Sequence, residues 1–352
     1  MRSGSSAAAG PTRGTEPRNA LARVRRVLFL RTDRLGETIL NIPAVASLKA
    51  ALPGCTLTFM VRSELGPLFE GAPWADRVLP YPDSGGGWLA RAWRLARLLR
   101  RQRFDLAIVS NPKKELHLAV WLAGIPRRVG YDRKWGGLLT HRLPDGKAVR
   151  RLHEVDFNLE LVRTLELPTE VPHRWLPAFD RERTEVRQRL GRHRVKAEED
   201  VIVLHPWAST PRKQWPLERF QALIHRLRRD GHARLVLVGG AEERSRAQAL
   251  LGDGQDVINF VGELTLRELA ALLEASSLLV SNDSGPVHLA AAVGTATLVL
   301  FGLAATPGGP QRWGPWGAGH TVISRASIGD ITVEDVVEAL YRHTGWALLN
   351  AS

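Results

Sequence analysis

The chain contains 352 residues, of which 44% are hydrophobic and 24% charged, and its 49 Lys and Arg outnumber its 36 Asp and Glu to give a formal net charge of +13. The length allows two domains, the composition is typical of a globular protein, and no segment reaches the roughly 18 consecutive apolar residues of a membrane span. The single cysteine, Cys55, excludes an internal disulfide and a cysteine metal cluster, which indicates a reducing compartment and hence a cytoplasmic protein.

Residues 1–23 are rich in Ser, Ala, Gly and Arg and lack the apolar stretch of a secretion signal, so we expect a disordered basic tail. From residue 24 to 170, short apolar stretches alternate with stretches of helical periodicity. The pattern predicts strands at 27–30, 56–61, 77–79, 105–109 and 128–130, and helices at 38–51, 88–101 and 116–123. This alternation is typical of an α/β domain with a parallel sheet.

The loop after the first predicted strand reads Arg-Thr-Asp-Arg-Leu-Gly-Glu-Thr over residues 31–38 and opens the next helix. Gly36 permits close approach of another backbone, and Glu37 lies in the first helical turn, at the sheet edge where α/β proteins bind ligands. An ionised carboxylate in this position suits a general base. It also suits the positive end of a helix dipole, and spacing alone favours neither role.

Two stretches of the first domain are basic. The predicted helix 88–101 carries arginines on one face and apolar residues on another, as in an interfacial helix, although a helix that covers a sheet is the favoured interpretation. The arginines are Arg91, Arg94, Arg97 and Arg101, and the apolar residues are Trp88, Ala92, Leu95 and Leu99. The span 127–151 has eight Lys and Arg against Asp132 and Asp145, which suits a phosphate-bearing partner such as nucleic acid or an anionic lipid headgroup. Because no nucleic-acid-binding motif accompanies the span, nucleic acid is disfavoured.

Prolines and a charged stretch interrupt the alternation over residues 171–199, where we place the interdomain connection with a solvated helix at 185–190. The alternation resumes in a second α/β domain, residues 200–330. Strands are predicted there at 201–204, 235–238, 257–258, 278–280 and 297–301. A final helix at 332–343 begins the C-terminal segment 331–352.

The first loop of the second domain offers hydroxyl groups from Ser209 and Thr210 and cations from Arg212 and Lys213, a combination that suits an anion. The alternative is a solvated basic loop that Trp215 anchors to the core. Two glycines after the next strand let a ligand approach, and the following Glu243 suits ribose hydroxyls.

The segment 281–292 reads Ser-Asn-Asp-Ser-Gly-Pro-Val-His-Leu-Ala-Ala-Ala and follows a buried strand. It combines a polar turn with the start of an apolar helix, whose unpaired amide groups suit an anion. An ordinary crossover with a well-capped helix is the alternative. A later Trp-Gly-Pro-Trp-Gly run at 313–317 is interpreted as a packed surface turn. No metalloprotease, serine hydrolase or Walker motif is present, which disfavours metal-dependent hydrolysis.

These residues resemble one family: the segments 31–43, 105–132, 205–220, 236–243 and 259–302 are similar to the ADP-heptose:lipopolysaccharide heptosyltransferases, inverting glycosyltransferases with the GT-B fold. The resemblance extends over residues 26–345. It implies an α/β protein with two Rossmann-like domains whose parallel sheets face each other across a cleft. The first domain would hold mainly the acceptor and the second mainly the nucleotide sugar. ADP-heptose would be the donor substrate, with no cofactor and no metal.

The resemblance also implies roles for particular residues. The acidic residue after the loop glycine is the catalytic base and falls on Glu37, and the lysine at position 213 neutralises phosphate. The full donor-binding set that we predict is His205, Ser209, Thr210, Lys213, Glu243, Asp283, Ser284, Gly285, Pro286, Val287 and His288. The basic residues predicted to contact an anionic acceptor are Arg34, Lys113, Lys114 and Arg133.

Two departures from the family pattern stand out. Glu37 replaces the usual aspartate, which changes the reach of the carboxylate towards an acceptor hydroxyl. Residues 303–307 read Leu-Ala-Ala-Thr-Pro where many relatives carry Pro-Thr-Asp-Pro.

The sequence thus predicts an inverting, metal-independent enzyme that moves a heptose from ADP-heptose to a lipopolysaccharide inner-core acceptor, in the cytoplasm and in peripheral contact with the inner membrane surface. Glu37 would deprotonate the acceptor hydroxyl, Lys213 and the helix amides near Gly285 would stabilise the departing diphosphate, and Asp283 would orient sugar hydroxyls. One alternative is a transferase or epimerase for another nucleotide sugar on the same fold. The other is a non-catalytic protein that binds a nucleotide sugar or an anionic lipid.

Overall fold

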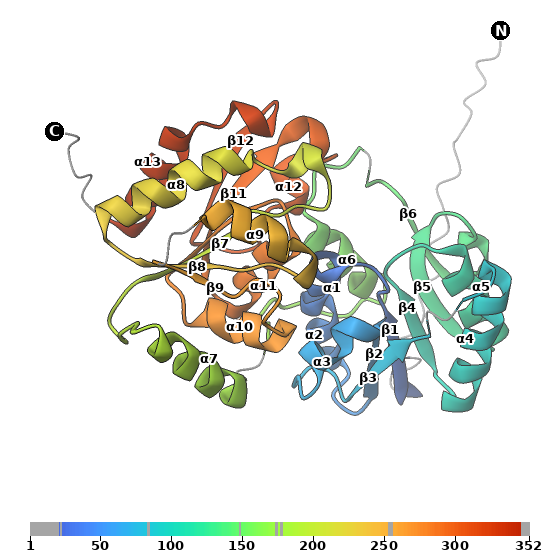
Figure 1. Ribbon diagram of the computed structural model, residues 1–352. Coiled ribbons are helices and arrows are strands. Elements are labelled where there is room, and N and C mark those ends of the chain that lie inside the picture. Colours follow the sequence, from blue (N-terminus) through green and yellow to red (C-terminus); the bar gives the residue numbers. More distant parts are fainter. Residues whose placement is uncertain are drawn as a thin grey trace, which may run out of the picture.

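The computed structural model describes residues 21–345 except 22, 83–84, 148, 173–174, 177–178 and 253–255. Nearly all of the tail predicted over residues 1–23, and the chain after residue 345, lie outside this part. Two parallel six-stranded sheets with helices on both faces stand next to each other (Figure 1). The predicted α/β class with two Rossmann-like sheets is therefore confirmed.

The first sheet has the strand order β3-β2-β1-β4-β5-β6. Its strands are β1 (Arg26–Leu30), β2 (Thr56–Arg62), β3 (Arg77–Tyr81), β4 (Leu106–Val109), β5 (Arg127–Asp132) and β6 (His141–Pro144). The second sheet has the order β12-β11-β10-β7-β8-β9. Its strands are β7 (Val201–His205), β8 (Arg234–Leu237), β9 (Val257–Asn259), β10 (Leu278–Asn282), β11 (Ala296–Gly302) and β12 (His320–Arg325).

If β7 is counted as strand 1, the strand order of the second sheet is 6-5-4-1-2-3, which is the order of the first sheet, 3-2-1-4-5-6, in reverse. Both halves therefore have the dinucleotide-binding topology, with switch points between β1 and β4 and between β7 and β10.

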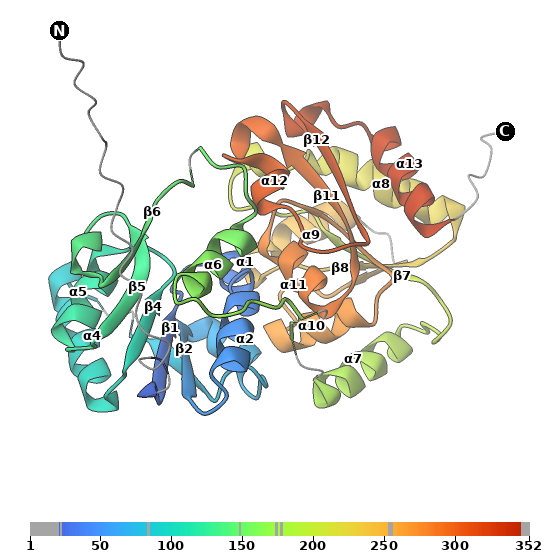
Figure 2. The same cartoon turned by 180° about the vertical axis from the view of Figure 1, so that it is seen from behind.

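Helices of the first half are α1 (Leu35–Ile39), α2 (Ile42–Ala51), α3 (Gly66–Phe69), α4 (Trp88–Gln102), α5 (Lys114–Leu122) and α6 (Glu154–Arg163). Those of the second half are α7 (Asp180–Arg192), α8 (Leu217–Asp230), α9 (Arg244–Leu251), α10 (Leu266–Glu274), α11 (Gly285–Val293), α12 (Gly309–Trp313) and α13 (Val333–Thr344). One buried apolar cluster extends from α2 and α6 across the boundary into α10 and α11. Figure 2 shows α1, α2 and α6 on the side of the first sheet that faces the second half.

Several predicted elements need correction. The helix predicted over 38–51 is two helices, because Pro43 lacks an N–H and stands at the start of α2. The strands β6 and β12 and the helix α6 were not predicted. Both strands are sheet edges with polar or charged residues instead of an apolar run.

The helix predicted as solvated within the connection is longer than expected. It is α7, which packs on α10 and buries Val186 and Leu190. An ion pair between Arg183 and Glu274, with N and O atoms 2.6 Å apart, joins the two helices. This part of the connection is therefore attached to the second half.

Candidate active site

A pocket of about 580 Å³ lies between the two halves, at the carboxyl ends of the parallel strands. The first half contributes Arg34, Leu35, Gly36 and Glu37 from the β1–α1 loop and α1. The second half contributes the loops after β7, β8 and β10 together with α12. The pocket is thus built at the switch-point edges of both sheets.

An ion pair stands on the second-half side of the pocket. Lys213 Nζ lies 2.7 Å from Asp283 Oδ2, and the Thr306 hydroxyl donates to the same oxygen at 2.7 Å. Lys213 ends the short 3-10 turn Pro211–Lys213, while Asp283 follows β10. The ammonium group has further N–H donors for an anion in the pocket.

The start of α11 opens into this pocket next to the pair. Its N-cap residue, Ser284, makes no side-chain cap. Instead, the Ser284 hydroxyl lies 2.9 Å from the Ser281 hydroxyl and 3.2 Å from His205 Nδ1. The Gly285 amide is consequently available to an anion, whereas Pro286 has no N–H and the Val287 amide donates to the Ser284 carbonyl at 3.2 Å. Burial lowers the pKa of His205 to about 4, so this imidazole is neutral at pH 7.

The two halves meet most closely where α1 contacts α11. A Cβ atom on Gly36 would lie 2.5 Å from Cδ2 of His288, and Gly36 is buried. Burial lowers the pKa of His288 to about 4, so this contact is made with a neutral ring. Glycine at position 36 is therefore a steric requirement of the assembled pocket.

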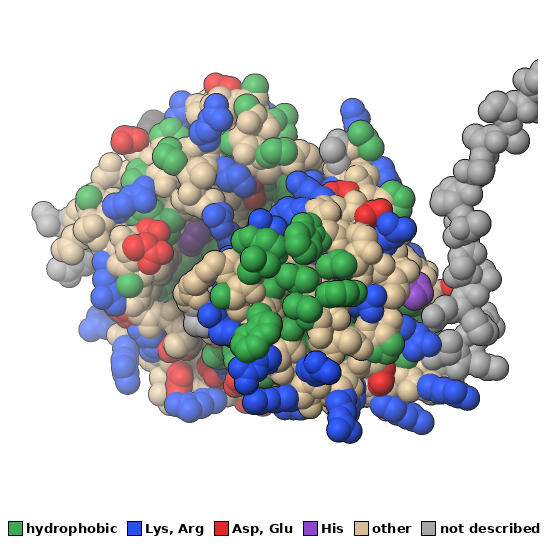
Figure 3. Space-filling view, turned by 90° about the vertical axis from the view of Figure 1, so that its right-hand side faces the viewer, with side chains coloured by type: hydrophobic (Ala, Val, Ile, Leu, Met, Phe, Trp, Pro, Cys, Tyr) green, Lys and Arg blue, Asp and Glu red, His purple; other side chains and the backbone are tan. Residues whose placement is uncertain are grey.

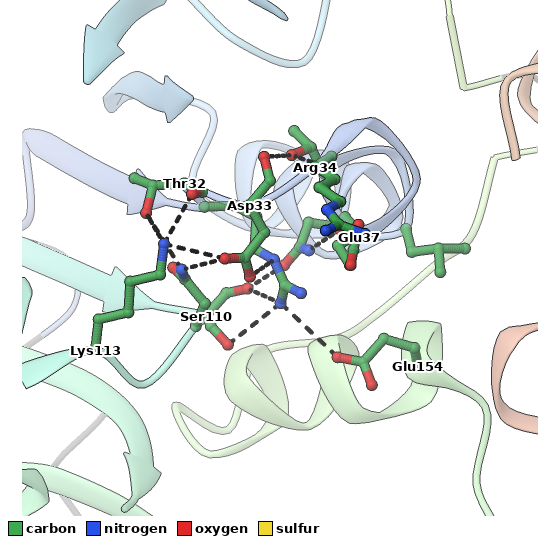
Figure 4. Close-up of polar contacts among 12 residues, drawn as sticks. Thr32, Asp33, Arg34, Glu37, Ser110, Lys113 and Glu154 are labelled. Atoms are coloured by element: carbon green, nitrogen blue, oxygen red, sulfur yellow. Dashed lines mark hydrogen bonds and ion pairs between the residues drawn. The ribbon is translucent and has the colours of Figure 1, made fainter. Parts of the chain in front are cut away.

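Glu37 lies on the opposite side from the Lys213–Asp283 pair, half-buried in α1. In the part of the chain that the structure describes, no hydrogen bond or ion pair engages its carboxylate. Figure 4 shows it beside Arg34, while the backbone carbonyl of Glu37 accepts a hydrogen bond from Asn41 Nδ2 at 2.7 Å. A carboxylate in this state is free to accept a proton from a hydroxyl in the pocket.

A polar network supports the loop that carries Glu37 (Figure 4). Asp33 pairs with Arg31 and with Lys113, in each case with N and O atoms 3.1 Å apart, and Lys113 also donates to the Thr32 carbonyl at 2.9 Å. Burial raises the pKa of Asp33, but the adjacent Arg31 and Lys113 charges outweigh it and leave the pKa below its ordinary value.

A buried carboxylate that the sequence did not reveal lies beneath this loop. Glu154, at the start of α6, contacts Lys147 Nζ at 2.6 Å, Arg312 Nη2 at 2.9 Å and Arg31 Nη1 at 3.8 Å. Burial raises its pKa, while these three cations lower it and determine the net direction. Because Arg312 belongs to α12, the cluster connects the two halves behind the pocket.

The wall of the pocket near the ends of β7 and β8 is closely packed. A Cβ on Gly239 would lie 2.3 Å from Trp207 Nε1, whose N–H donates to the Val238 carbonyl at 2.9 Å. Glu243 accepts a hydrogen bond from the Gly240 amide at 2.8 Å, and burial together with Glu242 raises its pKa. The second carboxylate oxygen of Glu243 can accept a ribose hydroxyl.

Most of the predicted site residues line this one pocket. They are Arg34, Glu37, His205, Ser209, Lys213, Glu243, Asp283, Ser284, Gly285, Pro286 and His288. Thr210 does not line it, and Val287 is buried in the apolar core. Lys113 and Lys114 line a separate hollow, and Arg133 pairs with Asp145 at 3.5 Å.

Residues that the sequence did not indicate also line the pocket, notably Trp207, Thr306, Arg312 and Trp313. The expectation that the run at 313–317 is only a packed surface turn needs correction, because Trp313 lines the pocket. It ends α12, and its ring lies against the Arg312 guanidinium, 4.7 Å from ring centroid to Cζ.

Among the described residues, no three His, Cys, Asp or Glu side chains are grouped as ligands for a metal ion. Within that same part of the chain, no helix has the length and apolarity needed to cross a bilayer.

The sequence matches the model of glycosyltransferase family 9 (heptosyltransferase) over residues 92–335. Lipopolysaccharide heptosyltransferase 2 of Escherichia coli K12 is 26% identical over 291 residues, which cover 79% of this chain and 82% of the relative. The solved structure of a family 9 glycosyltransferase from Veillonella parvula superposes with a TM-score of 0.82 at 20% identity, covering 91% of this chain and 97% of the other. That of the E. coli ADP-heptose lipopolysaccharide heptosyltransferase II superposes with a TM-score of 0.75 at 24% identity, covering 90% and 98%. The predicted GT-B fold is thereby confirmed.

Proposed function

The chain belongs to glycosyltransferase family 9, and from this membership we propose that it moves a heptose from ADP-heptose to an inner-core acceptor of lipopolysaccharide. It is a glycosyltransferase of the heptosyltransferase family. The donor, the stereochemistry, the independence of metal and the site of action at the cytoplasmic face of the inner membrane are parts of the proposal.

One observation carries the proposal: the interdomain pocket has an unpaired carboxylate on one side and an anion site on the other. Glu37 comes from the first half, and Lys213 and the start of α11 come from the second. A sugar diphosphate placed with its phosphates at Lys213 would direct its anomeric carbon towards the first half. An acceptor hydroxyl between that carbon and Glu37 is then in position for attack.

The reaction is a single displacement in this proposal. The acceptor oxygen forms a bond to the anomeric carbon, the bond from that carbon to the phosphate oxygen breaks, and the hydroxyl proton passes to Glu37. One displacement inverts the anomeric configuration. The negative charge that develops on the departing ADP is stabilised by Lys213, by the Gly285 amide and by the positive end of the α11 dipole, which take the part that a metal ion plays in other enzymes.

The neighbouring carboxylates are less suited to the base role. Asp283 already forms an ion pair with Lys213 and accepts a hydrogen bond from Thr306, and Glu243 accepts one from the Gly240 amide. In this proposal, Asp283 holds Lys213 in position and accepts hydrogen bonds from sugar hydroxyls. Glu243 accepts a hydrogen bond from the ribose.

The experiment is to incubate the purified chain with ADP-heptose and a truncated lipopolysaccharide core and to weigh the product by mass spectrometry. A mass gain of one heptose supports the proposal, and the anomeric configuration of the product, read by NMR, tests inversion. Unchanged rates in a chelator support metal independence. A panel of other nucleotide sugars tests the alternative donors, and donor binding without product on any core acceptor would indicate a non-catalytic binding protein.

A further inference from the structure

The outer surface of the first half carries a group of exposed large apolar side chains. They are Leu89 and Trp93 of α4, Trp121 and Leu122 of α5, and Trp135 just before the 3-10 turn Gly136–Leu138, with exposed fractions of 56%, 55%, 48%, 38% and 43%. We call this group the tryptophan face. Figure 3 shows a hydrophobic patch framed by Lys and Arg on this side of the molecule. A grouped apolar surface of this kind marks an interaction site.

The tryptophan face is additional to the apolar surface that the fold needs. The inner side of α4 already covers the sheet with Ala92, Leu95, Ala96 and Leu99, all buried. The helix therefore does cover a sheet, as the sequence favoured, but its outer side is not only charged. Trp93 stands in the middle of that outer side.

The surroundings of the face are positively charged. Helix α4 contains five arginines and no acidic residue. Arg100 and Arg101 are exposed, and the Arg97 guanidinium lies over the Trp93 ring, 4.7 Å from its centroid. At the edge of the face, a hollow of about 590 Å³ is lined by Lys113, Lys114, Glu115, Lys134 and Trp135. The ammonium groups of Lys114 and Lys134 suit a phosphate headgroup, while that of Lys113 is paired with Asp33.

We propose that the tryptophan face docks on an anionic bilayer surface. Tryptophan prefers the boundary between headgroups and acyl chains, and Lys and Arg next to it attract anionic lipids. A second copy of the chain is a poor occupant, because it would bring the same arginines into contact with one another. The apolar centre and the basic frame together match the two layers of a lipid interface.

The face adjoins the acceptor side of the pocket. Lys114 lies over the Trp88 ring, 4.2 Å from its centroid, and that ring contacts Trp135 with centroids 5.2 Å apart. The preceding residue, Lys113, binds the loop that leads to Glu37. Docking therefore brings the β1–α1 loop towards the lipid surface, and this step rests on the proposed function, in which the acceptor is lipid-linked.

The test is flotation of the full chain with phosphatidylcholine vesicles that contain or lack phosphatidylglycerol, without donor or acceptor. We expect binding that requires the anionic lipid. The double variant Trp93→Ser/Trp121→Ser should lower the partition coefficient at least about tenfold, since two large apolar side chains leave the interface. Arg100→Gln/Arg101→Gln should lower it by about fivefold for each charge.

The matched control is Arg187→Gln/Arg192→Gln, which removes two exposed arginines from α7 and should leave binding nearly unchanged. Equal losses in both arginine variants, or full binding by the tryptophan variant, would overturn the proposal. So would a dimer in light scattering that the tryptophan variant dissociates, because it would assign the face to a second copy.

Vesicle binding is independent of turnover, so the failure of one does not imply the failure of the other. Transfer to a soluble truncated core tests the enzyme activity, and the tryptophan variant should retain it. The same variant should lose transfer to an acceptor embedded in vesicles. Loss of both activities alike would contradict a role in docking.

Discussion

Arg312 on α12 and Glu154 on α6 form an ion pair that crosses from one half of the protein to the other, with Nη2 and Oε2 2.9 Å apart. The carboxylate is almost fully buried, with 1% of its side chain exposed. Arg31 and Lys147 contact it from the first half. A single buried anion therefore holds together three cations beneath the interdomain pocket.

We predict that Glu154→Gln lowers the free energy of unfolding by about 3–5 kcal/mol, because the buried Arg31 and the partly buried Lys147 and Arg312 lose the counter-charge of a fully buried carboxylate. Urea denaturation at neutral pH measures the change. Glu160→Gln is the control on the same helix, since the Glu160–Arg150 pair is more exposed and should contribute at most about 1 kcal/mol. Equal losses in the two variants would mean that burial of Glu154 is not the cause.

The Glu37 carboxylate provides the second prediction. Glu37→Gln keeps the size of the side chain but removes the proton acceptor, so kcat should fall by about 10²–10⁴. The Kd of ADP-heptose, measured by calorimetry, should stay the same because the proposed mechanism places Glu37 on the acceptor side. Glu37→Asp keeps the charge and should retain part of the turnover. Full turnover in Glu37→Gln would remove this residue from the base role.

The third prediction separates Lys213 from its neighbour. Lys213→Met removes the ammonium that faces the donor phosphates in the proposed mechanism, and should lower kcat/KM by about 10²–10³. Arg212→Met removes one charge from the same turn, but Arg212 is exposed and does not line the pocket. Its kcat/KM should be near that of the unaltered enzyme. Similar losses in both variants would indicate general attraction of the anion, not a contact with Lys213.

The alternation of apolar strands and helices was sufficient to predict both sheets, because buried parallel strands leave a clear apolar signature. It missed β6 and β12, whose edge positions tolerate charged and polar residues. The pocket loops were also accessible from sequence, since each one directly follows a strand and collects its polar residues at the same sheet edge.

The Glu154 cluster was not predictable in the same way. Arg312 is far from Glu154 in the sequence, and the fold alone brings them together. Charged residues in a basic stretch are expected to be solvated, so Lys147 gave no sign of burial. Trp313 was similarly ambiguous, because an aromatic residue directly before a Gly-Pro pair fits a surface turn as well as a pocket wall.

The contact between α1 and α11 leads to a fourth prediction. Gly36→Ala would place a methyl group 2.5 Å from Cδ2 of His288, so the two helices must move apart. Because the pocket needs both halves in register, kcat should fall by about 10²-fold. Gly191→Ala on α7 is the control, since a Cβ there meets no atom within 4 Å and the activity should not change. Gly36→Ala with normal kcat would show that the halves can separate without loss of function.

The last prediction concerns pH. His117 on α5 is fully buried, and burial lowers its pKa to about 4, whereas an unfolded histidine titrates near 6.5. Between these values the unfolded chain binds more protons than the folded one, so the free energy of unfolding falls as the pH falls from about 6.5 to 4. The contribution of His117 is fully present above pH 6.5 and amounts to about 3 kcal/mol.

Two further histidines with lowered pKa values, the partly buried His205 and the buried His288, act in the same direction. His117→Leu removes one titrating group, so its free energy of unfolding should depend less steeply on pH in this window. Urea denaturation at neutral pH and at several acidic pH values gives the slopes for both proteins. Because the slope is compared and not the absolute stability, a packing change at position 117 does not affect the result. Identical slopes would show that the buried imidazole gains its proton without cost to the fold.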